Sequence, residues 1–381
     1  MNYRNIIFLF FAFLCGKNFA QYRIGQWTDY LSYNTAQSVT KGADRVYVAT
    51  GSCVFSYKWS DNSLERVNKL NGLSDMGAKL VRYNSHNNTL MIVYANSNID
   101  ILKNGNITNF SDILRKNITA DKTIYHVSFF KEKAYIATGF GIVVFDTDKM
   151  EFKDTYIIGN NGNFLPIYDV AADSNKIFAA TAEGLKQANT NTNLNDFQNW
   201  SFATGLPKKA FNCVVKYKND FLANYSSTLD TGVDYKDTLY VYNGSTWDTV
   251  KKYHIAANQT YQIKRLIADD ENNNLYITDQ WGIDVFQKNP IWDKVYAVGG
   301  NFLFYNASGN WIFPGIKEAV LTPEFGSFVY CVATENCGLV KTSAFGGQES
   351  IKLDGPESNL VSQVSIIDNK MIVAPVYLTE I

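Results

Sequence analysis

Short strands of apolar and aromatic residues recur along this chain at a nearly constant interval. The recurring segments are Arg45–Thr50, Thr89–Tyr94, Lys133–Thr138, Lys176–Thr181, Asp220–Tyr225, Asn274–Asp279, Phe328–Thr334 and Asn369–Ala374. Their starts lie 44, 44, 43, 44, 54, 54 and 41 residues apart. A period near 44 residues, with several short strands in each period, is typical of a β-propeller, whose four-stranded blades cannot bury their faces alone. The pattern therefore predicts an all-β propeller.

The first repeat shows the expected blade. Its four predicted strands are Ala36–Thr40, Arg45–Thr50, Val54–Lys58 and Leu64–Val67. Gly, Asp, Asn and Ser separate them, and these residues reach the backbone conformations that tight turns need. In several repeats a Thr closes the second strand and a Gly opens the third, as in Thr138–Gly141 and Thr181–Gly184.

Seven repeats predict a seven-bladed ring over residues 21–355. Gln26–Tyr30 resembles an outer strand, so we expect it to close the ring by pairing with the last blade. The two 54-residue intervals predict insertions in blades five and six. The eighth repeat, within residues 356–381, predicts the first strands of an incomplete second propeller, because two strands without a successor leave exposed edges.

Residues 1–20 have the features of a signal peptide. Arg4 precedes an apolar run, Ile6–Leu14, and Ala20 lies at a suitable cleavage edge, so Gln21 begins the predicted mature chain. The alternative is a lipid anchor on Cys15, which the bulky preceding Leu14 disfavours. The apolar run is too short for a membrane-spanning helix. We therefore expect an exported protein, in the periplasm or on the outer-membrane surface.

Composition and motifs restrict the chemistry. The net charge is −1 and only 19% of residues are charged, without a clustered basic face, which excludes strong nucleic-acid binding. The three histidines, His86, His126 and His254, are far apart in sequence, and no nucleophile, phosphate-binding or metal-ligating motif is present. We therefore predict no catalytic, cofactor-binding or metal-binding residues and no enzymatic activity. A propeller hydrolase or lyase requires acidic residues from several blades to meet in a central cavity.

Two further candidates remain open at this stage. Cys331 and Cys337 flank a short turn and are candidates for a cross-strand disulfide, which export permits; the alternative is two unbridged thiols, and the strand register decides. Trp281 lies in a predicted turn, where packing does not explain it, and is the candidate for stacking on a glycan.

A string of short phrases resembles the PorZ family of type IX secretion propellers. The phrases are Ile24–Asn34, Asn71–Asp75, Lys103–Gly105, Arg115–Thr119, Gly139–Val144 and Asp154–Gly159. The resemblance implies a surface protein of the attachment complex that works beside a PorU-like sortase peptidase and helps to place anionic lipopolysaccharide on secreted cargo. Family members carry a second propeller and a C-terminal secretion-signal domain. This chain departs from that pattern because it stops inside the second propeller.

Two functions follow as hypotheses. The first is a non-enzymatic secretion accessory that binds a glycolipid, partner proteins or both. The second is a periplasmic oligosaccharide-sensing propeller of a hybrid two-component system, because the repeat also looks like those sensors. The gene sequence downstream of Ile381 separates them: a transmembrane helix favours the sensor, and a compact β-domain favours the secretion factor.

Overall fold

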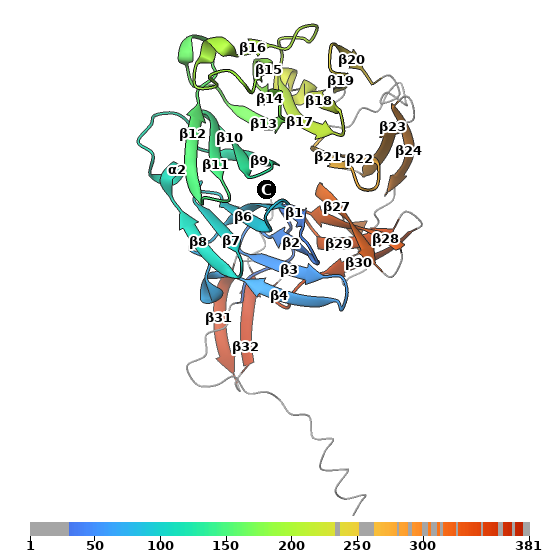
Figure 1. The fold of residues 1–381 in the computed structure, drawn as a ribbon. Coiled ribbons are helices and arrows are strands. Elements are labelled where there is room, and N and C mark those ends of the chain that lie inside the picture. Colours follow the sequence, from blue (N-terminus) through green and yellow to red (C-terminus); the bar gives the residue numbers. More distant parts are fainter. Residues whose placement is uncertain are drawn as a thin grey trace, which may run out of the picture. The chain divides into compact units, whose positions relative to one another are not determined.

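The computed structural model describes residues 30–232, 237–250, 263–279, 282–288, 292–298, 304–305, 311–312, 315–324, 327–343, 346–356, 361–367 and 370–375. Within this part of the chain, seven antiparallel four-stranded sheets each use strands that are consecutive in sequence. The inner strand of every sheet contacts the inner strands of the sheets before and after it, and the last contacts the first. The predicted seven-bladed propeller is confirmed (Figure 1).

Each blade runs from its inner strand to its outer strand. Blades one to three contain β1 (Ser38–Lys41), β2 (Arg45–Ala49), β3 (Val54–Lys58), β4 (Ser63–Val67), β5 (Ala78–Asn84), β6 (Thr89–Tyr94), β7 (Ile99–Lys103), β8 (Asn106–Phe110), β9 (Ile124–Phe130), β10 (Lys133–Thr138), β11 (Gly141–Asp146) and β12 (Glu151–Tyr156). Blades four to seven contain β13 (Ile167–Ala172), β14 (Lys176–Thr181), β15 (Gly184–Asn189), β16 (Ser201–Phe202), β17 (Phe211–Tyr217), β18 (Asp220–Tyr225), β19 (Thr238–Tyr242), β20 (Trp247–Thr249), β21 (Arg265–Asp269), β22 (Asn274–Thr278), β23 (Ile283–Lys288), β24 (Trp292–Val298), β27 (Ile316–Glu324), β28 (Ser327–Thr334), β29 (Gly338–Ser343) and β30 (Gly346–Ile351). The recurring phrase is thus the second strand of each blade.

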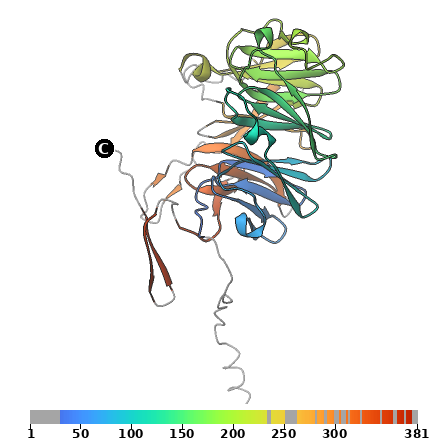
Figure 2. The same ribbon diagram turned by 90° about the vertical axis from the view of Figure 1, so that its left-hand side faces the viewer.

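The hydrophobic core is divided between the blades. Seven clusters of buried residues occur among the described residues, and each spans two neighbouring blades. Val48 and Phe55 of blade one, for example, share a cluster with Ala333 and Leu339 of blade seven. A blade is therefore stabilised by both neighbours, as expected for a repeat architecture in which a single unit cannot bury its faces. Figure 2 shows the same blades from the side of the ring.

The Thr–Gly phrase forms the same turn in several blades. The hydroxyl groups of Thr138 and Thr181 donate to the carbonyl oxygens of Gly141 and Gly184, each at 2.7 Å. Gly141 has φ +152°, and a Cβ there would lie 2.4 Å from the carbonyl oxygen of Tyr156. Glycine is required because both the backbone conformation and the close approach exclude a side chain.

Both predicted insertions are present. Blade five contains the helix α3 (Ser227–Thr231) between its second and third strands, and β25 (Phe304–Tyr305) and β26 (Trp311–Ile312) form a two-stranded sheet after blade six. The other helical segments among the described residues are α2 (Asp112–Arg115), η1 (Lys69–Asn71), η2 (Asn160–Gly162) and η3 (Phe197–Asn199). No helix of the described residues is long and apolar enough to cross a membrane.

Among the described residues, no strand before β1 takes part in closing the ring. Most of the segment predicted to pair with the last blade, Gln26–Tyr30, lies outside the described residues, and blade seven takes its outer strand, β30, from its own repeat. In the described residues, closure involves the residues just before β1. The backbone N–H of Ala36 donates to the carbonyl oxygen of Thr334 at 2.8 Å, and Lys352 donates to the Asn34 side chain at 2.9 Å.

The eighth repeat forms a hairpin of β31 (Val361–Ile367) and β32 (Lys370–Pro375). Its register shifts between Val361 and Gln363, as the inner strand of blade seven does between Ile316 and Glu318. The hairpin therefore has the local form of the first two strands of a blade. The incomplete second propeller stays a prediction.

Candidate functional site

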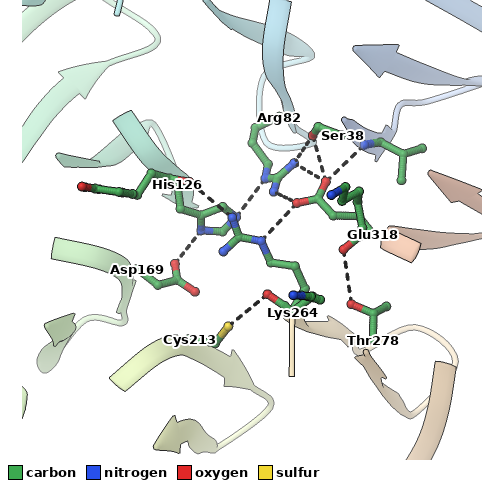
Figure 3. A network of polar contacts seen from close by, with 12 residues as sticks. Ser38, Arg82, His126, Asp169, Cys213, Lys264, Thr278 and Glu318 are labelled. Carbon is green, nitrogen blue, oxygen red and sulfur yellow. Dashed lines mark hydrogen bonds and ion pairs between the residues drawn. The ribbon is translucent and has the colours of Figure 1, made fainter. Parts of the chain in front are cut away.

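One polar residue from each blade faces the centre of the ring. In blade order, the seven residues of this central network are Ser38, Arg82, His126, Asp169, Cys213, Arg265 and Glu318. All lie on inner strands, and Figure 3 shows the six that it labels, all except Arg265, converging from the surrounding strands. Because an inner strand leaves one edge unpaired, polar side chains at this position can also satisfy backbone groups that would otherwise lack partners.

A β-bulge places most of these side chains. In blades three, four, five and seven the register of the first two strands shifts by one residue, and the network residue follows the extra residue directly: His126, Asp169, Cys213 and Glu318. A bulge bends the strand and redirects the following side chain. In blade two the residue after the bulge is Leu80, and Arg82 comes two residues later, on the same strand face.

Glu318 is the centre of the network. Its Oε2 accepts hydrogen bonds from the Ser38 hydroxyl at 2.8 Å, the backbone N–H of Val39 at 3.1 Å and Nη1 of Arg82 at 3.0 Å. Its Oε1 accepts from Nη2 of Arg82 and from Nε of Arg265, the latter at 3.1 Å. Burial opposes its charge, but the two guanidinium groups outweigh burial and lower the pKa of Glu318 to about 2. Glu318 is ionised and links blade seven to blades one, two and six.

His126 is neutral, and its tautomer follows from its partners. Nε of Arg82 donates to Nε2 of His126 at 3.0 Å, so Nε2 carries no proton. Nδ1 therefore holds the proton and donates to Oδ1 of Asp169 at 2.5 Å. Burial, followed by the charge of Arg265, lowers the pKa of His126 to about 4. Burial opposes the charge of Asp169, but His126 and Arg265 hold the pKa of Asp169 below its usual range.

The other members complete the ring. Burial raises the pKa of the Cys213 thiol to about 12, and the protonated thiol donates to the carbonyl oxygen of Lys264, in the segment before β21, at 3.5 Å. Two arginines balance two carboxylates, so the network has no net charge while His126 is neutral. The two arginines, the two carboxylates and His126 are hydrogen-bonded to one another.

A cavity of about 320 Å³ lies against this network. Its lining follows the inner strands from the network residues toward their C-terminal ends, as in His126–Phe129, Asp169–Ala172 and Arg265–Ala268. The network therefore forms one end of the cavity, and aliphatic side chains form most of its walls. No group of three or more His, Cys, Asp or Glu side chains in the described residues is arranged to hold a metal ion.

None of the candidate residues proposed from the sequence belongs to the central network. Ala20, Gln21 and Trp281 lie outside the described residues. No disulfide joins Cys331 and Cys337 in the part of the chain that the structure describes. Cys331 pairs with Lys341 across the β28–β29 hairpin, whereas Cys337 lies within the turn, so the two cysteines do not face each other. Of the two readings left open, the unbridged one describes the structure.

The sequence did not reveal the central network. It did raise the possibility that acidic residues from several blades meet in a central cavity, as a hydrolase or lyase would require. Acidic residues from different blades do meet in a central cavity, but arginines bind them. Successive network positions lie 44, 44, 43, 44, 52 and 53 residues apart, close to the repeat period. Aligning the inner strands on that period would have found them. A motif search could not, because the seven residues have six different types.

Comparisons with known proteins agree with the fold. Residues 46–201 match the family model described as the N-terminal β-propeller domain of PorZ, TSS9. A structure of PorZ, described as an essential bacterial surface component of the type IX secretion system of Porphyromonas gingivalis, superposes with a TM-score of 0.69 at 19% identity. That match covers 93% of this chain and 43% of the PorZ chain, so this chain spans less than half of that protein's length.

Other matches show only the propeller architecture. The computationally designed Ika8 protein has a TM-score of 0.50 at 11% identity, covering 90% of this chain and 95% of its own. A chain of the mitotic checkpoint complex has a TM-score of 0.52 at 10% identity, covering 82% of this chain and 98% of its own. No match was found among curated proteins. The resemblance expected from the sequence is confirmed: the chain is similar to the PorZ family, through its N-terminal β-propeller domain over residues 46–201.

Proposed function

We propose that this chain is a component of a type IX secretion system, located at the bacterial cell envelope or surface, and that it acts by binding rather than by catalysis. The observation that carries the proposal is the match of residues 46–201 to the PorZ N-terminal propeller domain. The superposition on PorZ over 93% of the chain supports it. The predicted leader, residues 1–20, would direct such a protein out of the cytoplasm.

The chemistry of the central network supports a non-enzymatic role. A general base needs a free lone pair within reach of a substrate proton. Glu318 already accepts five hydrogen bonds, and both ring nitrogens of His126 are engaged. Asp169 accepts from His126 and from the backbone N–H groups of Val170 and Val214. These interactions connect the blades at the centre of the ring, which is a structural task.

The binding partners we propose come from the PorZ resemblance. They are an anionic lipopolysaccharide and the PorU-like sortase peptidase of the attachment complex, which together would support the processing of secreted cargo. Propellers bind through their surfaces and loops while the blades hold those loops in place. Because this chain covers 43% of the PorZ structure, it would supply part of that interaction surface.

Deletion of the gene in its own bacterium tests the proposal. We expect cargo of the type IX system to accumulate unprocessed in the periplasm, with maturation restored when the gene is returned on a plasmid. Immunoblots of cell-envelope and medium fractions measure the ratio of precursor to mature cargo. Normal cargo maturation in the deletion strain would refute the proposed role.

A further inference from the structure

A groove of about 210 Å³ lies at the blade boundary that closes the ring. Blade one lines it with residues of β3, β4 and the turn between them, and blade seven lines it with residues of β29, β30 and the segment after β30. Two of the lining residues, Leu64 and Ile351, belong to the hydrophobic cluster that these blades share. Part of the lining is therefore apolar.

A chain of polar contacts crosses the groove from blade seven to blade one. Nζ of Lys341 lies 3.3 Å from Oε2 of Glu349 and donates to the Tyr57 hydroxyl at 3.1 Å. That hydroxyl in turn donates to Oδ1 of Asn62 at 2.6 Å. The ammonium of Lys341 also lies 5.5 Å from the centre of the Tyr57 ring. The Tyr57 hydroxyl is thus held by both blades, which gives the polar groups of the lining defined positions.

The groove contains both hydrogen-bond donors and acceptors. The side chain of Glu349 is 65% exposed, so its carboxylate can accept from a bound molecule. Asn62 uses its Oδ1 to accept from Tyr57, and Nδ2 of the same amide is a donor. The Ser350 hydroxyl donates to the carbonyl oxygen of Cys337 at 2.8 Å, and its oxygen can accept as well. A ligand that fits must bring groups of both kinds.

This lining disfavours two classes of ligand. An anion would meet the carboxylate of Glu349, and both lysines of the lining already bind protein oxygens: Lys341 that of Glu349, and Lys352 Oδ1 of Asn34 at 2.9 Å. A purely apolar molecule would remove water from the ion pair of Lys341 and Glu349 without replacing its hydrogen bonds, which is costly. A sugar avoids both penalties, because its hydroxyl groups donate and accept and its C–H groups can cover the apolar part of the lining.

We propose that this groove binds one ring of an uncharged hexose. The volume of about 210 Å³ corresponds to on the order of seven water molecules, which leaves room for a single pyranose ring to displace them. Hydroxyl groups of the sugar would donate to Glu349 and accept from Nδ2 of Asn62, and its C–H face would lie on Leu64 and Ile351. The inference does not depend on the secretion role, because the groove lies on the outer strands and needs no partner protein.

Saturation-transfer difference NMR of the full chain tests the proposal, with glucose, galactose and mannose as separate probes at millimolar concentration. We expect at least one of the three to bind, with a dissociation constant in the millimolar range. The methyl glycoside of the sugar that binds best identifies the source of the ring. Equal binding of the glycoside assigns the groove to a sugar within a longer chain, and loss of binding assigns it to a free sugar.

Two variants and a matched control locate the binding. Glu349→Ala removes one acceptor, and we expect it to weaken sugar binding roughly three- to tenfold, as loss of one hydrogen bond does. Glu65→Ala is the control, because the Glu65 side chain is 62% exposed and also binds one cation, Arg45, away from the groove; it should bind the sugar normally. Ser350→Trp fills the groove from its exposed rim, and we expect it to abolish binding while the thermal unfolding midpoint stays unchanged.

Two results would overturn the proposal. The first is that none of the three sugars binds at millimolar concentration, which would mean a groove that holds water only. The second is that Ser350→Trp and Glu349→Ala both bind the sugar as tightly as Glu65→Ala, which would place the sugar elsewhere on the protein.

Discussion

Glu318 balances two buried guanidinium groups, so its charge determines whether the centre of the ring is stable. In Glu318→Gln, Arg82 and Arg265 keep most of their neighbours but lose the carboxylate. Leaving a buried charge without its partner costs about 3–5 kcal/mol. We expect the free energy of unfolding to fall by that amount in urea titrations.

Glu65→Gln provides the matched control for that measurement. Glu65 also binds an arginine, Arg45, but its side chain is 62% exposed, and exposed ion pairs contribute about 0–1 kcal/mol. A Glu318→Gln protein within about 1 kcal/mol of the wild type would show that the central ion pairs do not stabilise the ring.

His126 makes the stability depend on pH. Its pKa is about 4 in the folded protein and 6.5 for an exposed histidine, so the unfolded chain takes up a proton that the folded chain excludes as pH falls below 6.5. Stability is complete above pH 6.5 and decreases toward pH 4, by up to about 3 kcal/mol. Glu318, with a pKa of about 2, adds to the loss only below about pH 4.5. Thermal unfolding measured from pH 7 to pH 4.5 should therefore show a falling midpoint.

His126→Gln separates this contribution from others. A glutamine amide can donate to Asp169 and accept from Arg82 without titrating. We expect its unfolding midpoint to change little between pH 6.5 and pH 4.5. An equally steep decrease in the variant would assign the acid sensitivity to other groups.

At the scale of single residues, the sequence was a weak guide. Asp169 and Glu318 are ordinary acidic residues in strands of differing composition, and only their shared place in the repeat relates them. Their contacts join segments up to 280 residues apart, as for Ser38 and Glu318. Such contacts depend on the closed ring, which no local pattern encodes.

At the scale of elements, the same turns and bulges recur at equivalent positions in several blades. Thr138 and Gly141 could be predicted as a turn because their residue types have direct backbone consequences. The bulges in the inner strands could not, because a bulge depends on pairing between two strands and leaves no characteristic residue. The bulges nevertheless direct His126, Asp169, Cys213 and Glu318 toward the centre.

Gly141→Ala tests the requirement for glycine in the repeated turn. Gly141 and Gly105 both have positive φ, +152° and +78°, but an added Cβ meets the Tyr156 carbonyl oxygen at 2.4 Å in the first case and nothing within 4 Å in the second. We expect Gly105→Ala to cost about 1 kcal/mol of stability and Gly141→Ala to cost at least about 1 kcal/mol more, since the strand pair must shift as well. Equal losses in chemical denaturation would contradict the close-approach argument.

At the scale of the whole molecule, the 44-residue period predicted the blade number and the position of every second strand. The seven interblade clusters explain why: each blade repeats the same apolar positions because each faces two equivalent neighbours. In the described residues, blade seven consists of four consecutive strands and contacts blade one through Ala36 and Glu318; closure by Gln26–Tyr30 stays a prediction. The repeat pattern gives no signal for the contacts between blades seven and one, because these contacts occur once in the ring and do not recur along the sequence.

The central claim is that the charged groups of the central network stabilise the propeller of a binding protein and take no part in a chemical reaction. The most direct measurement is cargo maturation in the deletion strain complemented with the double variant His126→Gln and Asp169→Asn, which removes both ionisable groups. Of the two backbone N–H groups from which Asp169 accepts, those of Val170 and Val214, the Asp169→Asn amide oxygen can keep one. With protein levels matched by immunoblot, we predict the same ratio of mature to precursor cargo as with the wild-type gene. Unprocessed cargo in the presence of normal amounts of the folded variant would contradict the claim, because it would assign the activity to those two side chains.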